Sequence, residues 1–264
     1  MQNHAKNVFD SKLAAKQDLM TMLLPTLGAT ALYLIPLTLL SLAAVLYLGT
    51  DVNTILSHDA RDYLLCGAVY FLMYLFALKP IYFGLTQFYA VRRVGMRPSA
   101  AMPTMCFSSW SLYWKSITLT CCILLHCIAW AIPVGGIILA AGVLQQMFLS
   151  NQIGAFLVFE VGFLAACWYL CMVLRYQCAY ILLIEKPKLT SWQCVREAAA
   201  EFKGKKRALI SLVGSFMLWF LLIFLLGDVV LLFVYPYLLL TLFHLFDRIR
   251  GVKIIITSEP LSKE

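Results

Sequence analysis

Two ionisable residues lie inside long apolar runs and are the first candidates for chemistry. Glu160 occurs in FLVFEVGF and His126 in CILLHCIAW. Ionisable side chains inside lipid are costly and count as functional hypotheses, so a Glu–His pair could relay protons or bind a cation. The favoured alternative is that Glu160 is protonated or bonded to a nearby polar group and that His126 is a neutral core histidine. Lys79 and His244 lie near the ends of apolar runs, where we expect their polar groups to snorkel to the membrane surface.

Other signatures of catalysis are absent from the sequence. It contains no HExxH, GxSxG or P-loop motif and no pair of carboxylates on one predicted helix face. Its nine cysteines include neither a CxxC pair nor a Cys/His spacing suited to zinc. Most lie in apolar runs, where a free thiol behaves as a small hydrophobic group. We therefore predict that the protein is not an enzyme and uses no metal and no cofactor.

The composition indicates which solvent surrounds these residues. Of 264 residues, 62% are hydrophobic and 13% charged, whereas a soluble domain carries roughly 25% charged residues. A helix needs about 20 apolar residues to cross a bilayer, and backbone groups in lipid must pair within the helix. The sequence predicts an all-α integral membrane protein with six spans, at Leu23–Leu48, Tyr63–Tyr89, Ile117–Leu144, Ile153–Arg175, Ala208–Leu226 and Val229–Phe246. The first run is too long for a signal-peptide core, so we expect it to remain as an anchor.

The distribution of charge predicts the orientation. If six spans alternate, 20 of the 21 Lys and Arg residues lie on one side and only Arg61 lies on the other. By the positive-inside rule, both termini are then cytoplasmic. The predicted organisation is a cytosolic tail over residues 1–22, a transmembrane domain over residues 23–246 and a second cytosolic tail over residues 247–264.

A cluster of cations directly precedes the fifth span. Lys203, Lys205, Lys206 and Arg207 stand next to the apolar run ALISLVGSFMLW. Each juxtamembrane cation is worth about 1 kcal/mol beside an anionic leaflet. We therefore predict contact with anionic phospholipids or with a protein partner at this edge. Nucleic acid is a poor ligand for the cluster, because the cluster is held against lipid.

The loop before this cluster predicts an amphipathic helix at about 191–203. Thr190 and Gln193 match a capping box, and Gly204 would end the helix. Trp192 and Phe202 fall on its apolar arc. The helix either lies in the headgroup plane with these two rings inserted, or packs on the cytosolic ends of the spans.

A family resemblance covers the C-terminal part of the chain. The segments RYQCAYILLIEKP, AAAEFKGKKRALISLVGSFMLW and VYPYLLLTLF resemble the signature of the bacterial membrane family catalogued as domain of unknown function 975. The matching residues are Tyr176, Tyr180, Pro187, Lys203, Gly204, Lys206, Ser215, Phe216, Trp219, Pro236 and Tyr237. Ala198 and Phe202 depart from that pattern, which often has Ser and Met there. The resemblance implies a multi-pass protein of the bacterial cytoplasmic membrane and no established reaction.

Two hypotheses for the function follow. The first is a non-catalytic scaffold, accessory or envelope-homeostasis protein that acts through its basic cytosolic face. The alternative is a small transporter or channel component that uses Glu160, His126 and the helix breaks at Pro133 and Pro236. The small residues Gly135, Gly136 and Ala140 suit close helix packing either within the chain or between copies, so the oligomeric state stays open.

Overall fold

A computed structural model describes residues 2–48, 60–99, 101–148 and 151–251, which are helical apart from short turns and connections. Six helical segments in this part of the chain are long and apolar enough to cross a membrane. They are Leu23–Leu48, Arg61–Arg93, Trp110–Gln145, Phe156–Glu185, Lys206–Ile223 and Val229–Arg250. The prediction of an all-α protein with six span-like helices is thereby confirmed, and the protein is a multi-pass membrane protein by the length and composition of its helices.

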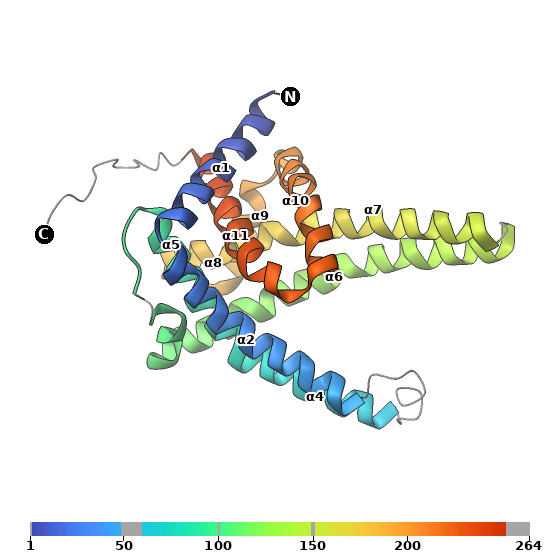
Figure 1. Cartoon of the computed structure of the whole chain (residues 1–264), viewed down its shortest axis with the longest axis horizontal. Coiled ribbons are helices and arrows are strands. Elements are labelled where there is room, and N and C mark those ends of the chain that lie inside the picture. The colour runs from blue at the N-terminus through green and yellow to red at the C-terminus, as the bar shows by residue number, and fades with distance from the viewer. Residues whose placement is uncertain (1, 49–59, 100, 149–150, 252–264) are drawn as a thin grey trace, which may run out of the picture.

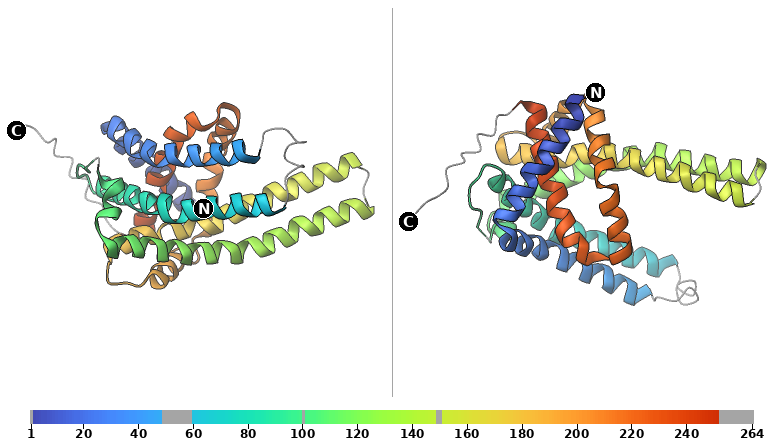
Figure 2. Two further views of the ribbon diagram at one scale, coloured as in Figure 1. Left: turned by 90° about the horizontal axis from the view of Figure 1, so that it is seen from below. Right: turned by 45° about the horizontal axis from the view of Figure 1, so that its top comes forward.

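The spans form hairpins that diverge from one end of the molecule (Figure 1, Figure 2). The hairpin of α2 (Leu23–Leu48) and α4 (Ala60–Met73) and that of α6 (Trp110–Phe148) and α7 (Asn151–Gln177) leave this end toward the same side and separate at an angle. A third hairpin, α10 (Lys206–Leu226) and α11 (Asp228–Arg250), joins them, because α10 packs on α7 and α11 packs on α2.

The common end, here called the base, is built from shorter helices and the last turns of α11. These helices are α1 (Gln2–Thr21), α5 (Lys79–Arg93), η2 (Met102–Ser108), α8 (Ala179–Glu185) and α9 (Ser191–Glu201). Many of the largest fully buried side chains lie here, including Phe83, Phe88, Tyr180, Phe243 and Phe246. The far halves of the hairpins have no comparable core: Leu64 is 75% and Leu139 is 73% exposed, as suits side chains that face lipid.

Two segments predicted as tails belong to the packed structure. Residues 1–22 were expected to be a cytosolic tail, but α1 packs along α11 and buries Val8, Ser11 and Ala15. The predicted C-terminal tail begins at residue 247, but Asp247 is 1% exposed and α11 continues to Arg250. A polar helix with a narrow apolar stripe, such as α1, can dock on a bundle without being hydrophobic enough to span a membrane. The cytosolic location of both segments stays a prediction. Residues 252–264 lie outside the described part.

Lys79 and His244 do not snorkel. The second span changes to a wider π-helical turn at η1 (Tyr74–Leu78), and Lys79 follows it with its side chain inside the bundle. The Lys79 Nζ lies 4.8 Å and 4.7 Å from the ring centroids of Tyr74 and Tyr82. His244 is 4% exposed, and its Nε2 is 2.8 Å from a carboxylate oxygen of Asp18. Their helix faces turn toward protein rather than lipid, so neither side chain needs to reach the membrane surface.

Candidate functional site

The structure does not bring Glu160 and His126 together. The His126 ring lies between Tyr176 and Trp192, with centroids 5.1 Å and 4.8 Å away, and its Nδ1 is 2.8 Å from the Cys122 carbonyl oxygen. Glu160 is exposed on α7, 16 residues before Tyr176 in the same helix, which is about 24 Å along the axis at the α-helical rise. A direct proton relay between the two side chains is therefore excluded in this conformation.

The cysteines form no metal centre in the described part of the chain. All nine are free thiols. No group of three or more His, Cys, Asp or Glu side chains among the described residues is arranged to hold a metal ion.

The helix α9 packs on the bundle, which is the second of the two predicted alternatives. Its capping box is present: the Thr190 hydroxyl accepts from the Gln193 backbone N–H at 3.3 Å, and the Gln193 side chain accepts from the Thr190 N–H at 2.9 Å. Its inner face, with Cys194 and Val195, is fully buried. Phe202 is 1% exposed and stacks on Phe246 at 5.7 Å, so it is buried in protein and does not insert into the headgroup layer.

Trp192 remains on the outside of α9. Its side chain is 52% exposed, and one face of the indole contacts the His126 ring. Trp192 lies in a helix outside the six span-like segments, and an exposed indole suits the interface between lipid and water. Of the two aromatic residues predicted to meet headgroups, only Trp192 is accessible to them.

The four clustered cations divide into two kinds. Gly204 adopts a φ of +79°, which reverses the chain between α9 and α10. Lys205 then points inward, and its Nζ donates to the Ile249 carbonyl oxygen at 2.8 Å, so it ties α10 to the end of α11. Lys203, Lys206 and Arg207 are exposed and form no ion pair within the described residues. These three residues are called the basic edge below.

Several arginines of the base, by contrast, are paired with carboxylates. Arg93 contacts Glu185 at 2.6 Å and Asp247 at 3.1 Å, and Arg250 contacts the same two carboxylates at 2.6 Å and 2.7 Å. This four-residue ion cluster joins α5, α8 and α11. It was missed by sequence analysis, since its members are separated by up to 157 positions along the chain. The two arginines and the two carboxylates have no net charge together. The ion cluster therefore stabilises the contact between these helices and offers no net charge to a ligand.

A second polar contact fastens the N-terminal helix. Asp18 of α1 pairs with His244 of α11, and the Arg92 guanidinium donates to the Asp18 carbonyl oxygen at 3.2 Å and to the Thr21 hydroxyl. The groups are largely buried, with Arg92 7% and His244 4% exposed. The Asp18–His244 contact joins α1 to α11, and the bonds of Arg92 join α1 to α5.

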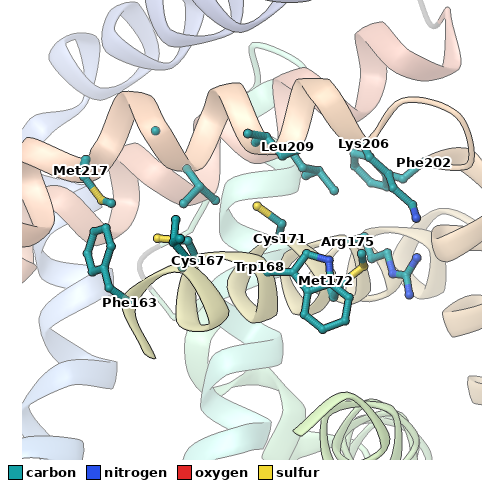
Figure 3. Close-up of a pocket in the computed structure, with 14 residues that line it drawn as sticks. Phe163, Cys167, Trp168, Cys171, Met172, Arg175, Phe202, Lys206, Leu209 and Met217 are labelled. Atoms are coloured by element: carbon teal, nitrogen blue, oxygen red, sulfur yellow. The ribbon is translucent and has the colours of Figure 1, made fainter. Parts of the chain in front are cut away.

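A groove lies between α7 and α10 beside the basic edge (Figure 3). It encloses about 430 Å³, and most of its walls are apolar or sulfur-containing side chains. Arg175 and Lys206 lie at one end of the groove, whereas Phe163 and Met217 lie at the other. The Arg175 Nη2 donates to the Tyr176 hydroxyl at 2.7 Å, and its guanidinium lies 5.4 Å from the Trp130 ring centroid.

Sequence analysis found Lys206 but not the groove. Arg175 was noted only as a charge at the end of the fourth span, because nothing in the sequence predicts that α7 and α10 are neighbours. The spacing of apolar residues within each helix gives no information about which helices pack together.

Comparison with known proteins adds no relative: no family model, no curated protein and no solved structure matches this chain.

Proposed function

We propose that the protein is a non-catalytic scaffold or accessory protein of the bacterial cytoplasmic membrane, with a role in envelope homeostasis. Its base faces the cytosol, and its basic edge gathers anionic lipid headgroups and a membrane or cytosolic protein partner. The bacterial location rests on the resemblance to the family catalogued as domain of unknown function 975, and the orientation rests on the charge distribution.

The main support for this proposal is that some cations of the base are paired with carboxylates and others are not. Arg93 and Arg250 are neutralised by carboxylates, whereas Lys203, Lys206 and Arg207 are exposed and have no acidic partner in the described chain. Unpaired cations at the start of a span attract an anionic leaflet. The alternative role in transport has no comparable support, since Glu160 and His126 are far apart.

The test compares two variants that lose the same charge. Lys203→Gln/Arg207→Gln neutralises the outer part of the basic edge and leaves the tether Lys205 in place. Lys188→Gln/Arg196→Gln is the control, because these cations are also exposed and without an ion pair in the described residues. After mild crosslinking in cells and purification in detergent, mass spectrometry measures the co-purifying phosphatidylglycerol and proteins.

We expect the basic-edge variant to lose most of the phosphatidylglycerol and any protein that depends on it, while the control retains them. Equal retention by the two variants, or a wild type that enriches no anionic lipid over the bulk membrane, would reject the proposal.

A further inference from the structure

We infer that the groove between α7 and α10 binds one anionic phospholipid, with its phosphate between Arg175 and Lys206 and an acyl chain along the apolar walls. This inference deepens the proposed function, on which its cellular role rests. It differs from a general attraction of headgroups because it predicts a single lipid molecule held at a defined position.

The groove is about as deep as one leaflet of a bilayer. From Lys206 to Met217 the groove follows α10 for 11 residues, and from Arg175 to Phe163 it follows α7 for 12 residues. At the α-helical rise these lengths are about 16 Å and 18 Å. One leaflet contributes about half of a hydrocarbon core that is about 30 Å thick. The groove thus matches the depth of one leaflet, with its two cations at the headgroup end.

The headgroup end of the groove carries positive charge. Among the described residues, Lys206 has no ion pair, and the polar or aromatic partners of Arg175 are the Tyr176 hydroxyl and the rings of Trp130 and Tyr176. A guanidinium suits the oxygens of a phosphate group, and the ammonium of Lys206 at the same end of the groove adds a second positive charge. Two cations favour a headgroup with net negative charge over a zwitterionic one.

The groove is also accessible to a lipid. Leu164 and Ile210 line the groove and are 63% and 59% exposed, and both lie within membrane-span segments. The opening therefore faces the hydrocarbon, from which a lipid can enter sideways. The volume of about 430 Å³ lies within the range of roughly 300–1,000 Å³ that is typical of ligand pockets. A membrane lipid is the occupant whose shape and charge match both ends of this groove.

Gly214 provides a way to fill the groove without disturbing the protein. It lines the groove, and a Cβ atom added there would meet no other atom within 4 Å. Leucine is also a better helix former than glycine, so we expect Gly214→Leu to fold. Gly142 in α6 is the matched control, because it has the same free space around its Cα and does not line the groove.

The experiment uses the full chain in nanodiscs made from equal amounts of phosphatidylglycerol and phosphatidylcholine with the same acyl chains. After transfer to detergent, native mass spectrometry counts the lipids that each chain retains. We expect wild type and Gly142→Leu to retain one phosphatidylglycerol. Gly214→Leu should retain about tenfold less, and so should Arg175→Gln, which loses a charge-assisted hydrogen bond.

The outcomes separate this inference from the proposed function. If Gly214→Leu retains as much phosphatidylglycerol as Gly142→Leu, or if wild type retains phosphatidylcholine equally well, the groove site is rejected. That result leaves the proposed function intact as long as Lys203→Gln/Arg207→Gln still loses lipid in cells. If glycerol phosphate without acyl chains displaces the retained lipid at equal concentration, the site recognises only the anion, and the lipid-binding inference is also rejected.

Discussion

At the scale of single residues, Asp247 and Asp10 both contact an arginine of α11, but their surroundings differ. Asp247 is 1% exposed and contacts Arg93 and Arg250. The side chain of Asp10 is 34% exposed and contacts Arg248 at 3.2 Å. Burial determines how much stability is lost when one partner of such a pair is removed, because in a buried pair the remaining charge is left uncompensated and away from water.

We therefore expect Asp247→Ala to destabilise the protein strongly. The loss should be about 3–5 kcal/mol for the buried residue, whereas Asp10→Ala should cost at most about 1 kcal/mol. The free energy of unfolding of each variant is measured by titrating the detergent-solubilised protein with sodium dodecyl sulfate while circular dichroism reports the loss of helix. Similar midpoints for the two variants would mean that the ion cluster does not stabilise the base.

The ion cluster could not be predicted from the sequence. The rule that cations near a span end snorkel depends on the direction that one helix face takes, and the sequence of one helix does not determine that direction. Lys79, Arg93 and His244 turn toward protein because α5 and α11 are covered by other helices. Pairing between residues far apart in the chain is a property of the tertiary structure.

At the scale of elements, the contact between α5 and η2 depends on a glycine. A Cβ atom added to Gly84 would lie 2.6 Å from the Met102 carbonyl oxygen and still closer to that of Pro103. Both neighbours are backbone atoms, so they cannot move without shifting η2. Cys106 of η2 is fully buried in this contact, and burial raises the pKa of its thiol to about 12.

We expect Gly84→Ala to detach η2 and to expose Cys106. In a background that keeps Cys106 as its only cysteine, the rate of maleimide labelling at pH 8 should rise at least tenfold, because an accessible thiol ionises with a pKa near 8.5. Gly67→Ala is the control, since a Cβ there meets nothing within 4 Å. Unchanged labelling of the Gly84 variant would mean that η2 tolerates the added methyl group.

Features that depend on residues close together in the sequence could be predicted, and contacts between residues far apart in the sequence could not. The capping box of α9 depends on residues three positions apart, so Thr190 and Gln193 predicted it correctly. The docking of α1 on α11 includes the contact of Asp18 with His244, more than 200 residues later in the chain. No short-range pattern reports such a contact.

At the scale of the whole molecule, six spans could be predicted because the thickness of a bilayer imposes a minimum length on each apolar run. The length of an apolar run gives no information about how helices pack, so the open arrangement of the hairpins could not be predicted. Gly135 and Gly136 were expected to support packing within the chain or between copies, and a Cβ at either meets no atom of this chain within 4 Å. Their free faces in α6 are therefore available to lipid or to another helix.

The orientation of the whole molecule is tested by labelling from outside the cell. In a background without native cysteines, Val229→Cys lies beside the turn at Gly227 and is 74% exposed as valine, and Arg97→Cys lies in the connection between α5 and η2. We expect a membrane-impermeant maleimide to label only the first in intact cells and both after permeabilisation. Labelling of only the Arg97 site in intact cells would invert the predicted topology.

The polar contacts that α1 and α5 make with α11 can form only late in biosynthesis. Asp18 leaves the ribosome long before His244, and Arg93 long before Asp247. Until the sixth span is made, these early charges have no partner from α11. The five earlier spans can enter the membrane, but the base cannot close. The last described helix is thus the one that completes the base. A chain released before α11 is made keeps Arg92 near Asp18 and Glu185 near Arg93 but lacks His244 and Asp247.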